Sequence, residues 1–175
     1  MTGAPTDFGH MRQIYQTTPP TGSLIAPFTS LEGYYVDALC VHVPTRQYQR
    51  DFVSAFYTTR LFRLERFVLS TLARTPTSDA DAMALAAGMT DRFAVWTVEA
   101  RREDEILLAD ASGRTKSWLH AAPEGQGTRL WFGSVVVPVM RKGKPTLGPV
   151  FHTLEGVHKV YARLLLKAAA SNLGG

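Results

Sequence analysis

Hydrophobic and polar residues alternate with a period of two along much of the second half of the chain. Such alternation is typical of strands that bury one face. It predicts strands at Arg92–Arg101, Glu105–Asp110, Arg114–Ala121 and Thr128–Val139, the last being the longest. Turns rich in glycine separate several of these strands, and a loop rich in glycine, proline and lysine, Arg141–Pro149, follows them. We therefore expect an antiparallel sheet in this half of the chain.

The end of the chain has a different pattern, in which apolar residues recur every three or four positions. This period is typical of an amphipathic helix, and it predicts a long helix that ends near Asn172. The predicted apolar stripe consists of Leu154, Val157, His158, Tyr161, Leu164, Leu165 and Ala168.

The region before the sheet predicts one strand followed by helices. Gly33–Val43 is rich in β-forming residues and apolar on both faces, which favours a well covered strand. Thr45 is expected to cap a first helix, and a second helix is expected at Leu61–Ala73. Ser78 is expected to begin a short third helix that ends at Gly88.

Composition sets the broad class of protein. A chain of 175 residues with 45% hydrophobic and 19% charged residues is typical of one globular domain. Residues 1–30 are rich in proline and are expected to form an arm with little regular structure, which could lie over the domain through Phe8, Ile14, Tyr15 and Phe28. Residues 31–175 are expected to form the domain. The net charge of +4 comes from scattered basic residues, which does not favour nucleic-acid binding.

The order of the predicted elements resembles that of the START-like superfamily, which includes polyketide cyclases, lipid-transfer domains and the birch-pollen-allergen proteins. The resemblance covers roughly residues 33–170. Within the superfamily, the chain is most similar to a bacterial family of uncharacterised proteins. The resemblance is carried by Phe93–Arg101, Asp110–Leu119, Leu130–Ser134 and the helix around His158–Leu166. It implies an α+β helix-grip fold, in which a curved antiparallel sheet wraps round a long C-terminal helix and short helices follow the first strand. It also implies that apolar or amphipathic small molecules bind between the sheet and that helix. No catalytic residues transfer from the superfamily.

Several polar side chains are candidates for one end of such a site. Asp110 and Arg114 are joined by a tight turn with Lys116 and Ser117 beyond, and Arg114 or Lys116 could orient an acidic or carbonyl group. The alternative is that Asp110 caps the turn and pairs with Arg114 on the surface. Glu99 could act as an acid or base inside a dry cavity, or it could lie at a solvated strand end.

Aromatic and histidine side chains complete the candidate set. Trp96, Trp118 and Trp131 lie on separate predicted strands and could line a ligand site, fill the core, or form an outer cluster that meets a partner subunit. His158 and Tyr161 lie one helical turn apart and could form a hydrogen-bonding end or a proton-transfer pair; a buried histidine satisfied by a backbone carbonyl is the alternative. The full set of ligand-binding candidates is Trp96, Glu99, Asp110, Arg114, Ser117, Trp118, Ser134, His158 and Tyr161.

The sequence has no motif typical of a disulfide-bonded, metal-binding, nucleotide-binding or membrane protein. The single Cys40 cannot form an internal disulfide and favours a reducing compartment. Histidine and cysteine spacings do not match a metal site, and Arg141–Pro145 does not match a phosphate-binding loop, so we expect no metal or other cofactor. A membrane-spanning run and a signal peptide are not evident, which makes the cytoplasm the expected location.

Three functions remain, and the first is preferred. It is the binding of a small apolar or amphipathic molecule between the sheet and the last helix. The second is an enzyme of cyclase or hydratase type that uses His158, Tyr161, Glu99 or Arg114 for acid–base chemistry. The third is a protein–protein interaction domain in which aromatic surfaces and the N-terminal arm mediate association, for example as a homodimer.

Overall fold

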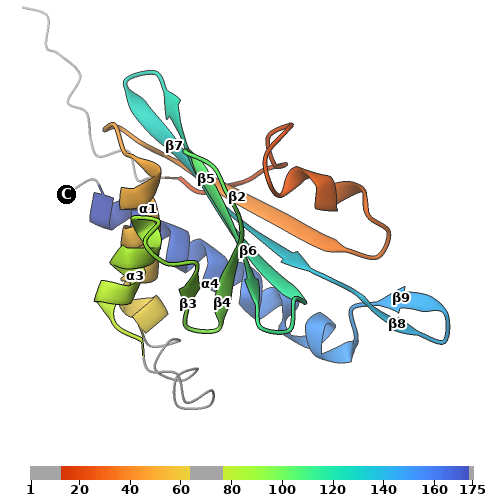
Figure 1. Ribbon diagram of the computed structural model, residues 1–175. Helices are drawn as coiled ribbons and strands as arrows, with labels where there is room; N and C mark the ends of the chain where they lie inside the picture. The colour runs from red at the N-terminus through yellow and green to blue at the C-terminus, as the bar shows by residue number, and fades with distance from the viewer. Residues whose placement is uncertain (1–12, 64–76, 174–175) are drawn as a thin grey trace, which may run out of the picture.

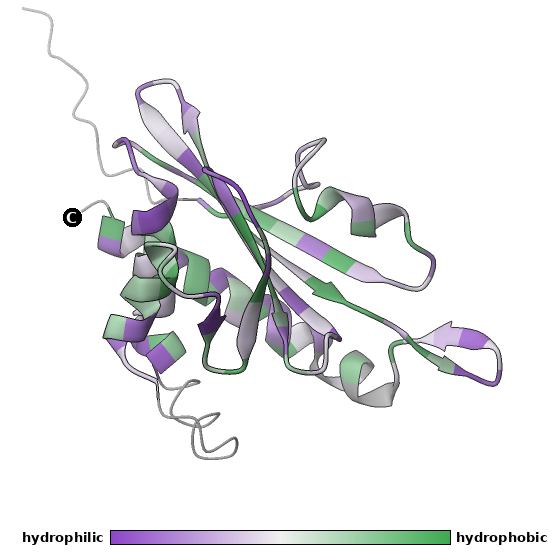
Figure 2. Cartoon of the chain, viewed as in Figure 1, coloured by the Kyte–Doolittle hydropathy of each residue, from purple (hydrophilic) through white to green (hydrophobic). Residues whose placement is uncertain are grey.

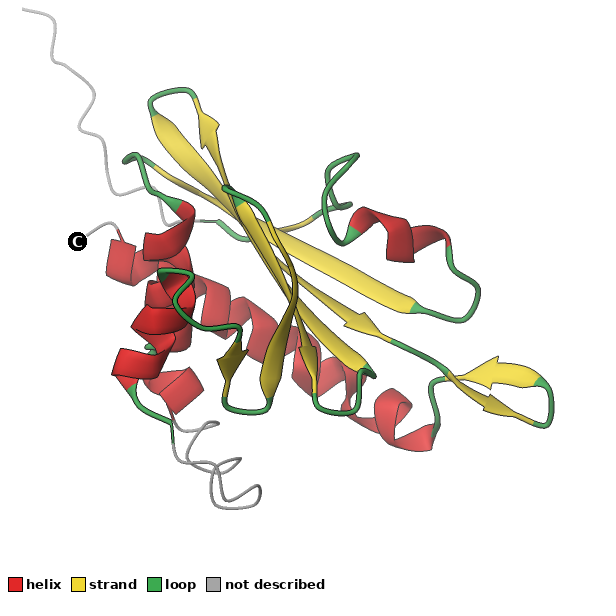
Figure 3. Cartoon of the chain, viewed as in Figure 1, coloured by secondary structure: helices red, strands yellow, loops and turns green. Residues whose placement is uncertain are grey.

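The computed structural model describes residues 13–63 and 77–173, and they form a curved antiparallel main sheet with helices against it and a small second sheet (Figure 1). The sheet has seven strands in the order β1-β2-β7-β6-β5-β4-β3. The long C-terminal helix α4 (Pro149–Leu173) lies along one face of the sheet (Figure 3). The α+β helix-grip prediction is confirmed in this architecture.

The central strands match the regions that alternate in sequence. From one edge of the sheet to the other, the strands are β1 (Tyr15–Gln16), β2 (Tyr35–Val43), β7 (Gly127–Val136), β6 (Thr115–Glu124), β5 (Glu105–Asp110), β4 (Trp96–Arg101) and β3 (Arg92–Phe93). Gly125 has a φ of 57° in the turn between β6 and β7, where a side chain would be strained. The register then places Leu39, Phe132, Leu119 and Ile106 side by side on the face toward the helices, hereafter the helix face.

The prediction of one strand at Arg92–Arg101 is wrong, because this stretch is a tight hairpin. Arg92 pairs with Thr97 and Phe93 pairs with Trp96, which leaves Ala94 and Val95 in the turn. Ala94 has a φ of 53°, a left-handed conformation that alanine rarely adopts. The sequence carries no glycine or asparagine there to signal the turn.

The helices between β2 and β3 follow the predicted order, although their first boundary differs. Helix α1 (Gln49–Tyr57) has Tyr48 at its N-cap position and no side-chain cap, so the prediction that Thr45 caps it is wrong. Helix α3 (Asp79–Ala86) begins as predicted, with a reciprocal capping box between Ser78 and Asp81. Of the predicted helix Leu61–Ala73, only residues 61–63 are described, and they are helical; the rest lies outside the described residues.

The stretch predicted as a loop, Arg141–Pro149, contains a second, two-stranded sheet instead. Strand β7 ends at Val136, earlier than expected, and β8 (Val139–Arg141) then pairs with β9 (Lys144–Thr146). This hairpin extends away from the main sheet before the chain enters α4 (Figure 1).

The stripe of helix α4 that faces the sheet matches the predicted one only in part. His158, Tyr161 and Leu165 face the sheet as predicted. The fully buried side chains are Ala162, Leu165, Leu166, Ala169 and Ala170, whereas Val157 and Leu164 are 66% and 51% exposed. Apolar residues lie on two sides of this helix, and the small alanines select the side that can approach the sheet closely. The side chain of Leu154 lies outside the described residues. No helix in the described ranges has the length and apolarity that crossing a bilayer requires.

The opposite face of the sheet, hereafter the outer face, is covered by the N-terminal segment. Ile25 is fully buried there among Ala38, Leu107, Trp118 and Val135, and the 3-10 helix η1 (Ala26–Ser30) follows it. Gly133 makes this packing close, because a Cβ at that position would lie 2.8 Å from Ile25 Cδ1 and 2.9 Å from the Trp118 ring. The segment predicted as an arm therefore packs on the domain from residue 13 onward. Phe8, which was expected to take part, lies outside the described residues.

Candidate functional site

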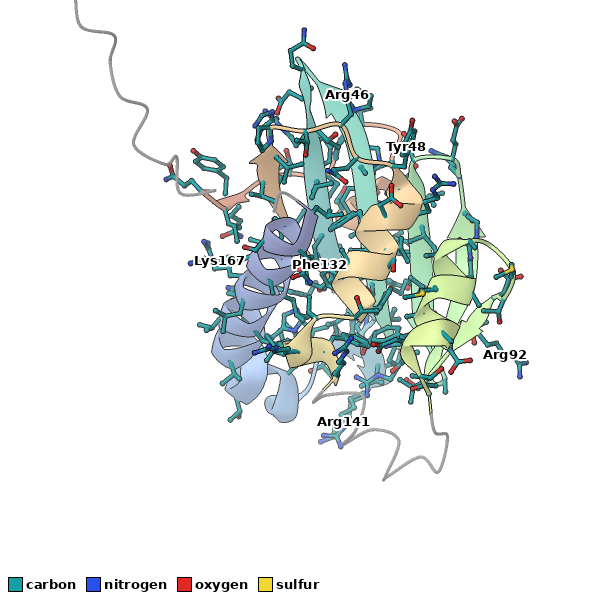
Figure 4. The ribbon with its side chains drawn as sticks, turned by 90° about the vertical axis from the view of Figure 1, so that its left-hand side faces the viewer. Arg46, Tyr48, Arg92, Phe132, Arg141 and Lys167 are labelled. Carbon is teal, nitrogen blue, oxygen red and sulfur yellow. The ribbon has the colours of Figure 1, made fainter. Side chains whose placement is uncertain are left out.

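A cavity of about 190 Å³ lies between the helix face of the sheet and the helices α1 and α4. Its apolar wall is largely aromatic and consists of Phe56, Tyr57, Phe62, Trp96, Phe132 and Leu165. Phe132 lies between α1 and α4 in front of the sheet (Figure 4), and its ring centroid is 4.8 Å from that of Phe56. The aromatic wall therefore brings together side chains from α1, the residues after α1, two strands and α4.

The cavity exists because one row of the sheet carries small polar side chains. Ser134 on β7 lies directly opposite Ser117 on β6 and opposite Asp37 on β2. The next row along the strands carries Phe132 and Leu119, which fill the space under the helices. Ser117 and Ser134 are much smaller than Phe132 and Leu119, so at this row the side chains leave a space between the sheet and α4.

Hydrogen bonds hold this polar row in place. Asp37 Oδ1 accepts from the Ser134 backbone N–H at 3.1 Å, and Asp37 Oδ2 accepts from the Tyr35 hydroxyl at 3.3 Å. The Tyr57 hydroxyl lies 3.4 Å from Ser117 Oγ. Burial, followed by the nearby Asp37 carboxylate, raises the pKa of Tyr35 well above its usual range, so this phenol stays protonated and remains a donor.

His158 links the polar row to α4. Its Nε2 lies 3.2 Å from Ser134 Oγ and 3.9 Å from Asp37 Oδ2, and the side chain is 32% exposed. In a nucleophilic triad the carboxylate and the hydroxyl contact different nitrogens of the imidazole. Here one nitrogen, Nε2, faces both groups, so the contacts orient the imidazole in an arrangement that differs from a nucleophilic triad.

A second, more open compartment of about 360 Å³ adjoins the cavity at Thr115 and His158, which line both. Its apolar wall is made by Val136, Leu147 and Phe151. Its polar wall includes Asp110, Ser112, Arg114 and Glu155. The inner cavity is therefore continuous in its lining with an outer compartment that is more polar and closer to solvent.

The structure brings most of the candidate residues to these two compartments. Trp96, Ser117, Ser134, His158 and Tyr161 line the inner cavity, and Asp110, Arg114 and His158 line the outer compartment. Asp110 does cap its turn, because its Oδ1 accepts from the backbone N–H of Arg114 at 3.0 Å. Among the described residues, the Arg114 guanidinium has no ion-pair partner, so the expected surface pair with Asp110 does not form.

Two candidates lie elsewhere, and their place in the site is corrected. Trp118 is fully buried on the outer face, where its Nε1 donates to Glu105 Oε2 at 2.8 Å. Glu99 pairs with Lys116, whose ammonium lies over the ring of Phe28 from the N-terminal segment. A bulge in β4 between Val98 and Ala100 interrupts the alternation at Glu99, so Ala100 packs on the outer face although Val98, two residues earlier, packs on the helix face.

The sequence analysis missed some residues that shape the site. Asp37 is the clearest, because it is a carboxylate on a strand face otherwise shared with Leu39, Val41 and Val43. A lone charge among apolar residues was a usable signal. Phe56 and Phe62 carried no such signal, since apolar residues at helical spacing are usually ordinary core.

The site has no features of a metal centre in the part of the chain that the structure describes, where histidine, cysteine and carboxylate side chains do not gather in threes. Comparison of the chain with family models, with curated proteins and with solved structures gives no match.

Proposed function

We propose that the protein binds one small apolar or amphipathic molecule in the cavity between the sheet and α4. The observation that carries this proposal is the aromatic-walled space of about 190 Å³ with a few fixed polar groups at one side. Ligand sites of this kind combine a mainly apolar lining with a small number of placed polar atoms. The START-like resemblance, which also implies a ligand between sheet and helix, is part of the same proposal.

The volume of the inner cavity limits the buried part of the ligand. An apolar cavity of about 150 Å³ in another protein binds benzene. The inner cavity therefore suits a single substituted aromatic ring or a short branched chain. A longer amphipathic molecule would place its remaining atoms in the outer compartment, past Thr115 and His158.

The polarity of the two compartments determines the orientation in which the ligand would bind. Apolar atoms gain most beside Phe56, Phe132 and Leu165 in the inner cavity. A hydroxyl or carbonyl group gains most near the polar row at Ser134 and His158, where hydrogen-bonding atoms are already held in place. We expect the ligand to carry one such group.

A pair of matched threonine substitutions tests the proposal. Thr115→Leu adds volume where the two compartments meet, whereas Thr97→Leu makes the same chemical change at an exposed position on the neighbouring part of the sheet. A hydrophobic fluorescent probe, and native mass spectrometry for a co-purifying molecule, report binding. We expect Thr115→Leu to lose uptake and Thr97→Leu to keep it; equal uptake by both variants would contradict a binding site in this cavity.

Acid–base catalysis in the same cavity is a second candidate, favoured by His158. Its imidazole lies where both compartments meet and contacts a hydroxyl and a carboxylate. This role predicts that His158→Gln abolishes turnover of any substrate found while leaving its binding within a few-fold, whereas a pure binding protein would show no turnover to lose.

A further inference from the structure

The tip of the β8–β9 hairpin gathers positive charge at one exposed point. Arg141, Lys142 and Lys144 lie within four successive residues, and all three are exposed. Within the described ranges, none of them has an ion-pair partner. Met140 beside them is 68% exposed, so an apolar side chain lies next to the cations at the surface. Figure 2 shows the hydrophilic tip at the end of this hairpin.

Two features of the hairpin tip are destabilising. Arg141 and Lys144 are direct cross-strand partners, and like charges directly opposite each other destabilise a strand pair. Lys142 has a φ of 49°, although glycine and asparagine adopt this left-handed conformation more readily. The tip keeps three cations at positions where the isolated hairpin would be more stable with other residues, and costs of this kind mark functional positions.

The hairpin packs on the domain at Pro145, the middle residue of β9, and at Pro138, just before β8. A Cβ at Gly33 would lie 2.6 Å from Pro145 Cβ and 3.5 Å from Pro138 Cγ, so the turn before β2 packs closely on both prolines. The hairpin extends away from the main sheet beyond this contact (Figure 1). In Figure 4, Arg141 lies at the lower end of the molecule, beyond the end of the sheet. The charged tip is therefore presented to solvent on an anchored support.

The same hairpin flanks the outer compartment. Val136 precedes the hairpin in the chain, Leu147 and Phe151 follow it, and all three line that compartment. The mouth of the proposed ligand site and the basic tip thus belong to one end of the molecule. Arg114, at the same mouth, adds a further exposed cation.

We infer that the β8–β9 tip binds the anionic headgroup surface of a lipid bilayer. Lysine and arginine clusters near such a surface are attracted to acidic lipids, each cation strengthening binding about fivefold. Met140 lies on the other face of the ribbon from Arg141 and Lys144, so an end-on approach would bring the thioether and the cations to the surface together. An exposed apolar side chain among cations favours a bilayer over a nucleic acid, which offers phosphates but no apolar layer.

Binding to the bilayer does not depend on the proposed function, but its purpose does. If the cavity holds an apolar molecule, docking at this end would place the outer compartment against the bilayer, and the molecule could pass from the bilayer into the cavity. The two ideas are therefore measured separately, by vesicle binding and by probe uptake.

The experiment compares two variants that remove the same charge. Arg141→Gln/Lys142→Gln/Lys144→Gln neutralises the tip, and Arg50→Gln/Arg92→Gln/Lys167→Gln neutralises exposed cations elsewhere. Co-sedimentation with phosphatidylcholine vesicles, with and without phosphatidylserine, measures binding. We expect the unaltered protein to bind only the vesicles with phosphatidylserine, less tightly as salt is added. The tip variant should bind them on the order of 100-fold more weakly, and the matched variant about as well as the unaltered protein.

Met140→Ser tests the apolar part with the charge kept, and we expect weaker binding to the same vesicles. Probe uptake by each variant in the absence of vesicles shows that the fold and the cavity are intact. The inference is overturned if the unaltered protein does not bind phosphatidylserine vesicles, if both charge variants lose binding equally, or if the tip binds duplex DNA or RNA but not vesicles.

Discussion

His158 on α4 and Ser134 on β7 approach to 3.2 Å, and this contact ties the C-terminal helix to the polar row of the sheet. Asp37 supports the same row from β2 through the Ser134 backbone. Three elements distant in the sequence therefore meet at one group of hydrogen-bonding atoms. A ligand oxygen placed there would meet atoms already fixed by the fold, which lowers the entropy cost of binding.

Replacing His158 should change the choice of ligand more than the strength of apolar binding. We expect His158→Leu to weaken phenol binding about tenfold relative to benzene, because one hydrogen bond to the hydroxyl is lost. Ligand-observed NMR titration of both compounds measures the ratio. An equal loss for phenol and benzene would mean that His158 contributes shape alone.

Glu105 should be the most sensitive charged residue on the outer face. Its side chain is 3% exposed and accepts from Leu24 N, Trp118 Nε1 and Arg102. Glu105→Ala leaves the fully buried Trp118 indole N–H and the half-buried Leu24 N–H without their acceptor, and we expect the free energy of unfolding to fall by about 3 kcal/mol. Urea unfolding measures it, with the exposed Glu103→Ala as the control. A small effect at both positions would show that the N-terminal segment contributes little to stability.

Gly133→Ala should loosen the N-terminal segment. The added methyl group would meet Ile25 Cδ1, the Trp118 ring and the Asp37 carbonyl oxygen at 2.8, 2.9 and 3.0 Å. We expect a loss of about 1–3 kcal/mol in the free energy of unfolding, as for other overpacked cores. The loss should be smaller when Ile25→Ala is already present, because the first of these clashes is then removed. Strictly additive losses in this double-mutant cycle would rule out the contact with Ile25.

Cys40 should react slowly with thiol reagents in the folded protein. Burial on the outer face raises the pKa of its thiol, so the thiolate is scarcer than in the unfolded chain. The folded state then holds its proton to higher pH than the unfolded state, and stability should fall as pH rises above the unfolded thiol's pKa. Cys40→Ala should remove that part of the pH dependence in urea unfolding. Fast labelling of the native protein by a disulfide reagent would contradict the assigned burial.

Local signals predicted much of the fold. The run Gly33–Val43 forms β2, and the Ser78–Asp81 pair caps α3, because each signal depends on neighbouring residues only. The turn at Ala94 and the two strands of the β8–β9 hairpin were missed. Alanine is not a typical turn residue, and proline is unfavourable inside a strand, so Ala94 and Pro145 give no local signal for these elements.

The site was harder to predict because it depends on which face each residue takes. Ser117 and Trp118 are neighbours in the chain, yet one lines the cavity and the other lies under the N-terminal segment. Register across β5, β6 and β7 decides this, and the bulge beside Glu99 changes it again. Tertiary packing, rather than residue type, determined which candidates came together.

Strand β6 has consequences for how distant substitutions are interpreted. Its consecutive residues face opposite sides of the sheet, so Ser117 lines the cavity and Trp118 packs on the outer face. A shift of Trp118 caused by a change around Ile25 would also move Ser117, which lines the cavity where we propose that the ligand binds. Variants of the N-terminal segment should therefore be tested for altered ligand affinity as well as for altered thermal stability, because strand β6 connects this segment to the cavity.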